Sequence, residues 1–247
     1  MGPPTTHIHD LSAGELDAEL ASLREHLADL QLPQIAHGRR AIILFEGPEG
    51  AGKKHALRQL AAAFDPCHFA VHPVLYDRRE AAEGHWLARF WRQLPGAGDT
   101  AIFFRSWYRR VLDDRVLGRT DETAVAHSFD EINEFEAQQR DYGTLIVKLY
   151  FDVSAKVQNR RLKERAANPW LRATPREGPV SVSDDAYVRA LRDLKTHSDM
   201  RWSPWKMIDG NDERHAAMMA LTVIADAWAA AMPMELPREA GRPTEAA

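Results

Sequence analysis

Residues 41–54 read Ala-Ile-Ile-Leu-Phe-Glu-Gly-Pro-Glu-Gly-Ala-Gly-Lys-Lys, an apolar run that leads directly into a glycine-rich segment. The apolar part, 41–45, is typical of a strand that is buried on both faces of a sheet. The next residues match Gly-x-x-x-x-Gly-Lys, and 55–64 has helical character. A strand, a glycine-rich turn and a helix in this order predict a loop whose backbone N–H groups hold phosphate oxygens. The residues expected to contact phosphate here are Gly47, Gly50, Ala51, Gly52, Lys53 and Lys54.

Four more apolar runs alternate with stretches of helical spacing along the chain. The expected strands beyond 41–45 are 69–76, 100–104, 145–151 and 205–208. The expected helices are 12–30, 55–64, 82–94, 121–141, 156–166 and 213–232. Strands that are separated by helices form a parallel sheet that is covered on both faces. The predicted fold class is therefore α/β, with a parallel five-stranded sheet, helices on both faces and a lid insertion.

These patterns divide the chain into three parts. Residues 1–34 are expected to form a tail and a helix, which starts with a capping box at Ser12 and Glu15. Residues 35–232 form the main domain, in which 167–204 carries four prolines and interrupts the alternation. We expect a mobile insertion there and a lid over about 156–204. The remaining residues, 233–247, are rich in Pro, Glu and Ala and are expected to be disordered.

Leucines recur along the first expected helix at alternating steps of four and three. They form one apolar stripe, at Leu16, Leu20, Leu23, Leu27 and Leu30. The stripe either packs on its own domain or contacts a second copy, and two heptads do not decide between these alternatives. We expect a homo-oligomer.

Composition excludes several classes of protein. The 247 residues carry a net charge of -4, which argues against a dedicated nucleic-acid-binding surface because such surfaces are strongly basic. The sequence has no apolar run long enough for a membrane span, so we expect no membrane association. Its one cysteine, Cys67, cannot form an internal disulfide, which fits the reducing cytoplasm.

Two basic motifs follow expected strands. Arg105, Arg109 and Arg110 come after the strand 100–104, at an edge where ligands gather in parallel sheets. Guanidinium groups bind phosphate in a bidentate way, so this cluster suits an extended polyanion. Arg160 and Arg161 lie in a basic helix after the strand 145–151, where they either contact phosphate or form a solvated helix face.

At these motifs the chain resembles a family-2 polyphosphate kinase, of the P-loop kinase superfamily. The family reads Phe-Glu-Gly-x-Asp-Ala-Ala-Gly-Lys-Gly at its phosphate loop, and residues 45–54 are similar to it. Its second motif, Asp-Arg-Ser-Trp-Tyr-Asn-Arg, is similar to 104–110. The resemblance extends over about 35–230 and includes the stretch 204–214. Residues 86–95 and 102–104 look most like the divergent N-terminal half of tandem polyphosphate:AMP phosphotransferases.

The chain departs from the family pattern at three positions. Glu49 replaces the aspartate of the loop, and Lys54 replaces the glycine after the lysine. Lys54 also stands where many P-loops have a Ser or Thr hydroxyl that contacts Mg²⁺. Phe104 replaces the aspartate of the second motif, and an aromatic ring cannot ligate Mg²⁺, which prefers oxygen.

The resemblance implies phosphoryl transfer between inorganic polyphosphate and a nucleoside mono- or diphosphate, with Mg²⁺ as cofactor. It implies catalytic roles for Lys53, Glu49, Arg105 and Arg110. Glu49 and Asp77 are the candidate metal ligands, and Asp77 and Tyr108 are the candidate nucleotide contacts. Alternatively, Asp77 is a turn residue paired with an arginine. The second function hypothesis is a catalytically impaired homologue that binds polyphosphate or nucleotide as a regulatory module. A P-loop kinase with another small acceptor is the third.

Overall fold

A computed structural model describes residues 12–75, 84–173 and 180–237, and its centre is a five-stranded parallel sheet. The strand order is β2-β3-β1-β4-β5, so the predicted central strand β1 lies between two later strands. In register, Ala41 of β1 lies beside Thr100 of β3 and Leu145 of β4. The strands are β1 (Ala41–Glu46), β2 (Phe69–Pro73), β3 (Thr100–Phe104), β4 (Leu145–Asp152) and β5 (Trp205–Asp209).

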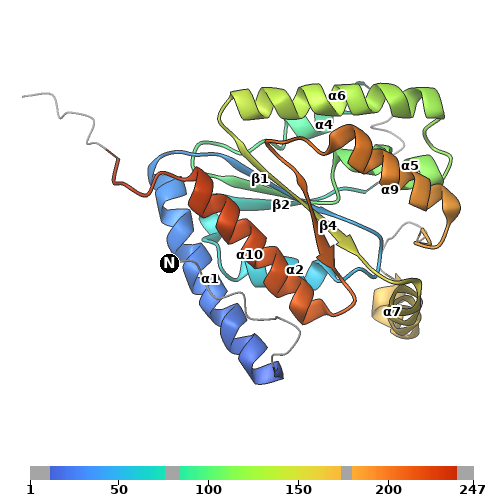
Figure 1. The fold of residues 1–247 in the computed structure, drawn as a ribbon, viewed down its shortest axis with the longest axis horizontal. Coiled ribbons are helices and arrows are strands. Elements are labelled where there is room, and N and C mark those ends of the chain that lie inside the picture. The colour runs from blue at the N-terminus through green and yellow to red at the C-terminus, as the bar shows by residue number, and fades with distance from the viewer. Residues whose placement is uncertain (1–11, 76–83, 174–179, 238–247) are drawn as a thin grey trace, which may run out of the picture.

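Helices cover both faces of the sheet, as Figure 1 shows. One layer contains α1 (Ala13–Ala36), α2 (Lys53–Ala61) and α10 (Glu213–Ala231). The other contains α4 (Ala88–Trp91), the short 3-10 helix η3 (Trp107–Arg110), α5 (Asp113–Val116), α6 (Glu122–Asp141) and α9 (Asp185–Ser198). Alternate residues of β1 face opposite layers, with Ile43 and Phe45 toward α10 and Ile42 and Leu44 toward α6. The predicted α/β class and the two-sided burial of 41–45 are confirmed.

The leucine stripe of α1 packs inside this chain. Leu16, Leu20, Leu27 and Leu30 are buried in the core cluster that includes α10. The helix starts with the predicted capping box, in which Glu15 accepts from the Ser12 backbone N–H at 2.8 Å. Of the two alternatives for the stripe, packing on its own domain is confirmed.

Two stretches differ from the sequence-based expectation. The predicted helix 82–94 is reduced to the single turn α4, because Pro95 and the glycines at 96 and 98 follow it closely. Within the expected mobile insertion, α9 is a packed helix with Tyr187, Ala190 and Leu194 buried against the core. The insertion also contains α8 (Pro169–Ala173), which follows α7 (Ala155–Ala167). The lid role of this region stays a prediction.

The end of the chain remains close to the body for a few residues past α10. Met232 is buried, and the Glu235 backbone carbonyl lies 2.6 Å from Nε2 of His37, just after α1. The expected disorder from 233 is therefore wrong for 233–237. Across the described ranges, no helix combines the length and apolar character that a bilayer span needs.

Candidate functional site

The glycine-rich loop lies between β1 and α2, where the sequence predicts it. Gly47 has a φ of 123°, and a side chain at this position would collide with the backbone carbonyl of Phe151 in β4. The loop therefore approaches the neighbouring strand too closely for any other residue. Gly52 caps α2 with a left-handed conformation, and the first residue of that helix is Lys53.

Lys53 is 4% exposed, and its amino group lies inside the loop. It donates hydrogen bonds to the carbonyl oxygens of Gly47 and, at 2.7 Å, of Pro48. Burial lowers the pKa of Lys53 to about 7, and nearby Arg105 lowers it further, whereas Glu46 and Glu49 oppose the shift. An amine that is held against the loop with this pKa can bind phosphate as an ammonium and lose its charge near neutral pH.

Glu46 is a site residue that sequence reasoning missed. It ends β1 immediately before the loop, is 3% exposed, and accepts a 2.6 Å hydrogen bond from Oγ of Ser106. Burial raises the pKa of Glu46, while the Ser106 hydrogen bond and the charges of Arg105 and Lys53 oppose that rise. Its position between a strand and a phosphate loop is the sequence signal that could have identified it.

Helix α7 holds the loop from the other side. Gln158 donates to the Glu49 carbonyl at 3.1 Å, and the Arg165 guanidinium lies 3.2 Å from the Glu49 carboxylate. Arg161 donates to the carbonyl oxygens of Gly50 at 2.8 Å and Gly210 at 2.6 Å. These residues lie on one face of the helix, so α7 and the loop form one hydrogen-bonded unit.

Several predicted phosphate contacts have other positions in the structure. Arg161 binds backbone carbonyls, because its guanidinium lies between the loop and the end of β5. Arg160 is 63% exposed and lies 3.9 Å from Glu164, so it belongs to the solvated helix face that was the alternative. Lys54 is exposed at the start of α2.

The turn after β3 carries the second basic motif. Arg105 has a φ of 64°, its backbone N–H donates to the Phe45 carbonyl, and its guanidinium pairs with Asp113. Arg110 donates to the Ser128 hydroxyl at 2.8 Å and lies 4.9 Å from the centre of the Trp86 ring. Arg105 is thus committed to a carboxylate, whereas Arg110 has neutral neighbours among these contacts.

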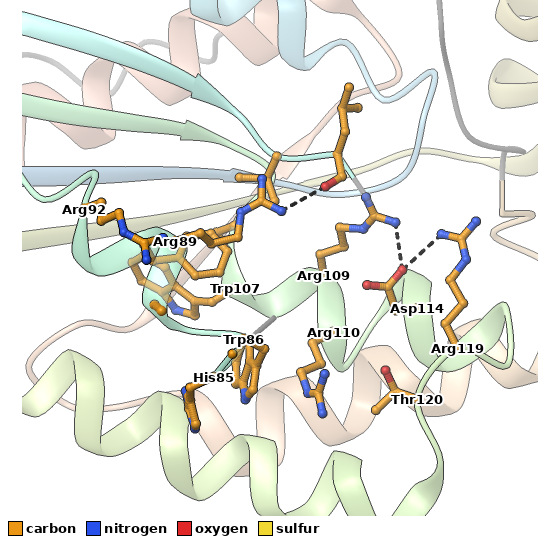
Figure 2. Close-up of a pocket in the computed structure, with 16 residues that line it drawn as sticks. His85, Trp86, Arg89, Arg92, Trp107, Arg109, Arg110, Asp114, Arg119 and Thr120 are labelled. Carbon is orange, nitrogen blue, oxygen red and sulfur yellow. Dashed lines mark hydrogen bonds and ion pairs between the residues drawn. The ribbon is translucent and has the colours of Figure 1, made fainter. Parts of the chain in front are cut away.

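A cavity of about 250 Å³ opens at the carboxyl ends of β2 and β3. Figure 2 shows the guanidinium groups of Arg109 and Arg119 converging on Asp114, at 2.7 and 3.1 Å, while Arg110 lies beside Trp86. Five arginines line this cavity: Arg89, Arg92, Arg109, Arg110 and Arg119. Sequence reasoning assigned no role to the first two or to Arg119, because they lie outside the recognised motifs. The arrangement suits a ligand with phosphate groups.

The two predicted nucleotide contacts do not meet at this cavity. Tyr108 is fully buried, and its ring packs 4.8 Å from that of Trp205 in the core. The prediction that its side chain contacts the nucleotide is therefore wrong in this conformation. Asp77 lies outside the described residues.

The described side chains do not fit a magnesium site held by the protein. Phe104 offers no oxygen and lies with its ring centre 5.7 Å from the amino group of Lys53. The Glu49 carboxylate faces Arg165. Within the ranges that the structure describes, no three acidic, histidine or cysteine side chains come together to hold a metal ion.

The profile of the family described as Polyphosphate kinase 2 (PPK2) matches residues 10–235. The chain belongs to this family. The resemblance at the phosphate loop and at the arginine turn is thereby confirmed over most of the chain.

Known members of the polyphosphate kinase 2 family differ from this chain mainly in length. A polyphosphate:AMP phosphotransferase of Pseudomonas syringae is 34% identical over 86% of this chain, which spans 42% of that relative. An ADP-polyphosphate phosphotransferase of Rhizobium meliloti is 30% identical, and the match covers 86% of this chain and 76% of the relative. A crystal structure of a polyphosphate kinase 2 from Pseudomonas aeruginosa has a TM-score of 0.81 and 30% identity, covering 92% of this chain and 49% of its own.

Proposed function

We propose that this protein transfers a phosphoryl group between inorganic polyphosphate and a nucleoside mono- or diphosphate. The observation that carries the proposal is the junction of the phosphate loop with the arginine-lined cavity. Ser106 lines that cavity and donates to Glu46, which directly precedes Gly47. A ligand phosphate in the loop and a second phosphorylated ligand in the cavity would therefore be neighbours.

The chain's own residues would act through charge and position. Phosphoryl transfer needs little covalent chemistry from the protein, and catalysis rests on positioning and on neutralising phosphate charge. Lys53 and the loop N–H groups would hold one phosphate, and Arg109, Arg110 and Arg119 would hold the other ligand. Phosphate oxygens would then compete with Asp114 for two of these arginines.

We further propose that the metal ion in this reaction is Mg²⁺ and that phosphate oxygens supply most of its ligands. Mg²⁺ commonly binds through one or two carboxylates together with substrate phosphates, and it keeps several waters. Glu49 is the carboxylate of the phosphate loop, and Arg165 would have to release it for this role. Mg²⁺ would neutralise phosphate charge in the complex.

The deciding experiment combines polyphosphate and Mg²⁺ with AMP, ADP, GMP or GDP in a coupled assay. Formation of the corresponding di- or triphosphate with any of them supports the proposal. Phe104 and the pairing of Glu49 with Arg165 favour a second candidate, a binding module that has lost turnover. Polyphosphate binding without turnover across all four nucleotides would identify that second candidate instead.

Replacing Arg110 by alanine is expected to weaken polyphosphate or nucleotide binding about tenfold or more, since a charge-assisted hydrogen bond contributes about 1.5–3 kcal/mol. The salt dependence of binding should also become shallower, because one cation is lost. The control is Arg140→Ala, which removes an arginine of α6 that pairs with Asp141 and does not line the cavity. Isothermal titration calorimetry at several salt concentrations would test both variants, and equal affinities would contradict the role of Arg110.

Polyphosphate affinity is expected to fall as the pH rises through and above neutrality. The pKa of Lys53 is about 7, so its ammonium form dominates below this pH and its neutral form above it. A bound polyanion favours the ammonium, so the midpoint in the complex should lie above that of the free protein. The matched variant is Lys53→Arg, whose guanidinium stays charged and should give a flatter profile. An equally steep profile in that variant would assign the titration to another group.

A further inference from the structure

A buried ion pair lies beneath the arginine turn, in a part of the core that the proposed reaction does not use. Nζ of Lys148 in β4 is 3.0 Å from Oε2 of Glu136 in α6, and both side chains are 0% exposed. A buried pair of charges is costly unless further hydrogen bonds satisfy its remaining polar atoms. The other partners of this pair therefore indicate what it holds in place.

Two of those partners are consecutive residues of η3. Nζ of Lys148 donates to the Tyr108 hydroxyl at 3.2 Å and to the Ser198 carbonyl at 2.7 Å. Oε1 of Glu136 accepts from Nε1 of Trp107 at 2.9 Å. The ion pair thus connects β4, α6 and the end of α9 to the base of the arginine turn.

The turn presents its side chains in two directions. Trp107 and Tyr108 point into the core, where both are nearly or fully buried, whereas Arg109 and Arg110 line the cavity. Ring packing alone leaves an aromatic side chain free to slide, but a directional hydrogen bond fixes the position of each ring along its edge. At the start of the turn, the Ser106–Glu46 hydrogen bond ties it to the phosphate loop.

We propose that Lys148 and Glu136 are positioning residues, which hold η3 so that Arg109 and Arg110 face the phosphorylated ligand. This inference rests on the proposed function for the identity of that ligand. Misplacement of binding groups by about 1 Å can cost a reaction about 100-fold, so a pair that touches no ligand can still control turnover.

The test uses the double variant Glu136→Gln with Lys148→Met, which removes both charges together and leaves no lone buried ion. We expect about tenfold lower affinity for inorganic polyphosphate or about tenfold lower kcat/KM. Independently of any ligand, hydrogen exchange measured by mass spectrometry should become faster in peptides that cover 105–112 and stay unchanged in those that cover 41–46.

The matched control is Tyr150→Phe, which removes the 2.8 Å hydrogen bond between the buried hydroxyls of Tyr150 and Tyr187, away from η3. It should leave exchange in 105–112, polyphosphate affinity and kcat/KM unchanged. Unchanged exchange in the double variant would overturn the inference, as would faster exchange with unaltered binding and turnover. If the parent protein binds no polyphosphate and has no turnover, the proposed function fails, and the inference falls with it. Failure confined to the variant comparison would defeat the inference alone.

Discussion

Replacing Lys53 by methionine is expected to reduce phosphoryl transfer at least about 100-fold, the usual cost of removing a donor that stabilises developing charge. Methionine has a similar length, so it keeps the volume of a side chain that is 4% exposed but cannot donate to phosphate. The fold should persist, because the amino group bonds only to carbonyls of its own loop in the described contacts. Turnover and thermal unfolding would be measured on the same preparation.

The control for this variant is Lys195→Met, which removes an exposed lysine of α9 and should leave turnover unchanged. Full turnover in the Lys53 variant would show that the loop is not the catalytic phosphate site. A large loss of stability would show that the lysine supports the loop itself, and a second variant, Lys53→Arg, would then separate charge from folding.

Replacing Phe104 by aspartate is expected to raise Mg²⁺-dependent turnover above that of the parent. The family has a carboxylate at this position, and a carboxylate would supply the oxygen that the described site lacks. The same change should raise the pKa of Lys53, because a negative charge would replace a ring 5.7 Å from its amino group. The polyphosphate-binding profile should therefore shift to higher pH.

Burial opposes this gain. Phe104 is half-buried and packs against the core cluster of α2 and α10, so its loss is expected to cost about 2 kcal/mol of folding stability. The matched variant Phe104→Asn loses the same packing without adding a charge. Equal turnover in the two variants would show that the carboxylate adds nothing. If folded Phe104→Asp and the parent both lack turnover with all four nucleotides, the enzyme proposal falls and the binding module remains.

Local patterns were sufficient for most of the fold. The run 41–45, the glycine spacing that follows it and the capping box at Ser12 each determine structure within a few residues of themselves. Alternation of strands and helices then predicted a parallel sheet, which the strand order confirms. Helix α9 was missed because its apolar face is short and lies inside a segment rich in proline and charge.

The candidate site was harder to predict because side-chain partners come from distant parts of the chain. A sequence shows that Arg161 and Tyr108 belong to conserved-looking motifs of the family, but only the fold shows that one binds carbonyls and the other is buried. Glu46 acquires its role from Ser106, and Lys148 from Glu136, through contacts that no spacing rule describes. Motif matching locates the site, and packing decides which motif residues face a ligand.

The central position of β1 has a consequence for how the chain reaches its native state. Residues 41–46 are completely buried, yet their partners in the sheet begin at Thr100 and Leu145. During synthesis this apolar run must therefore wait for about half of the chain before both of its edges are paired. Such non-local pairing slows folding and leaves apolar strands open to aggregation. The phosphate loop, which is anchored to that strand, can be completed only near the end of folding.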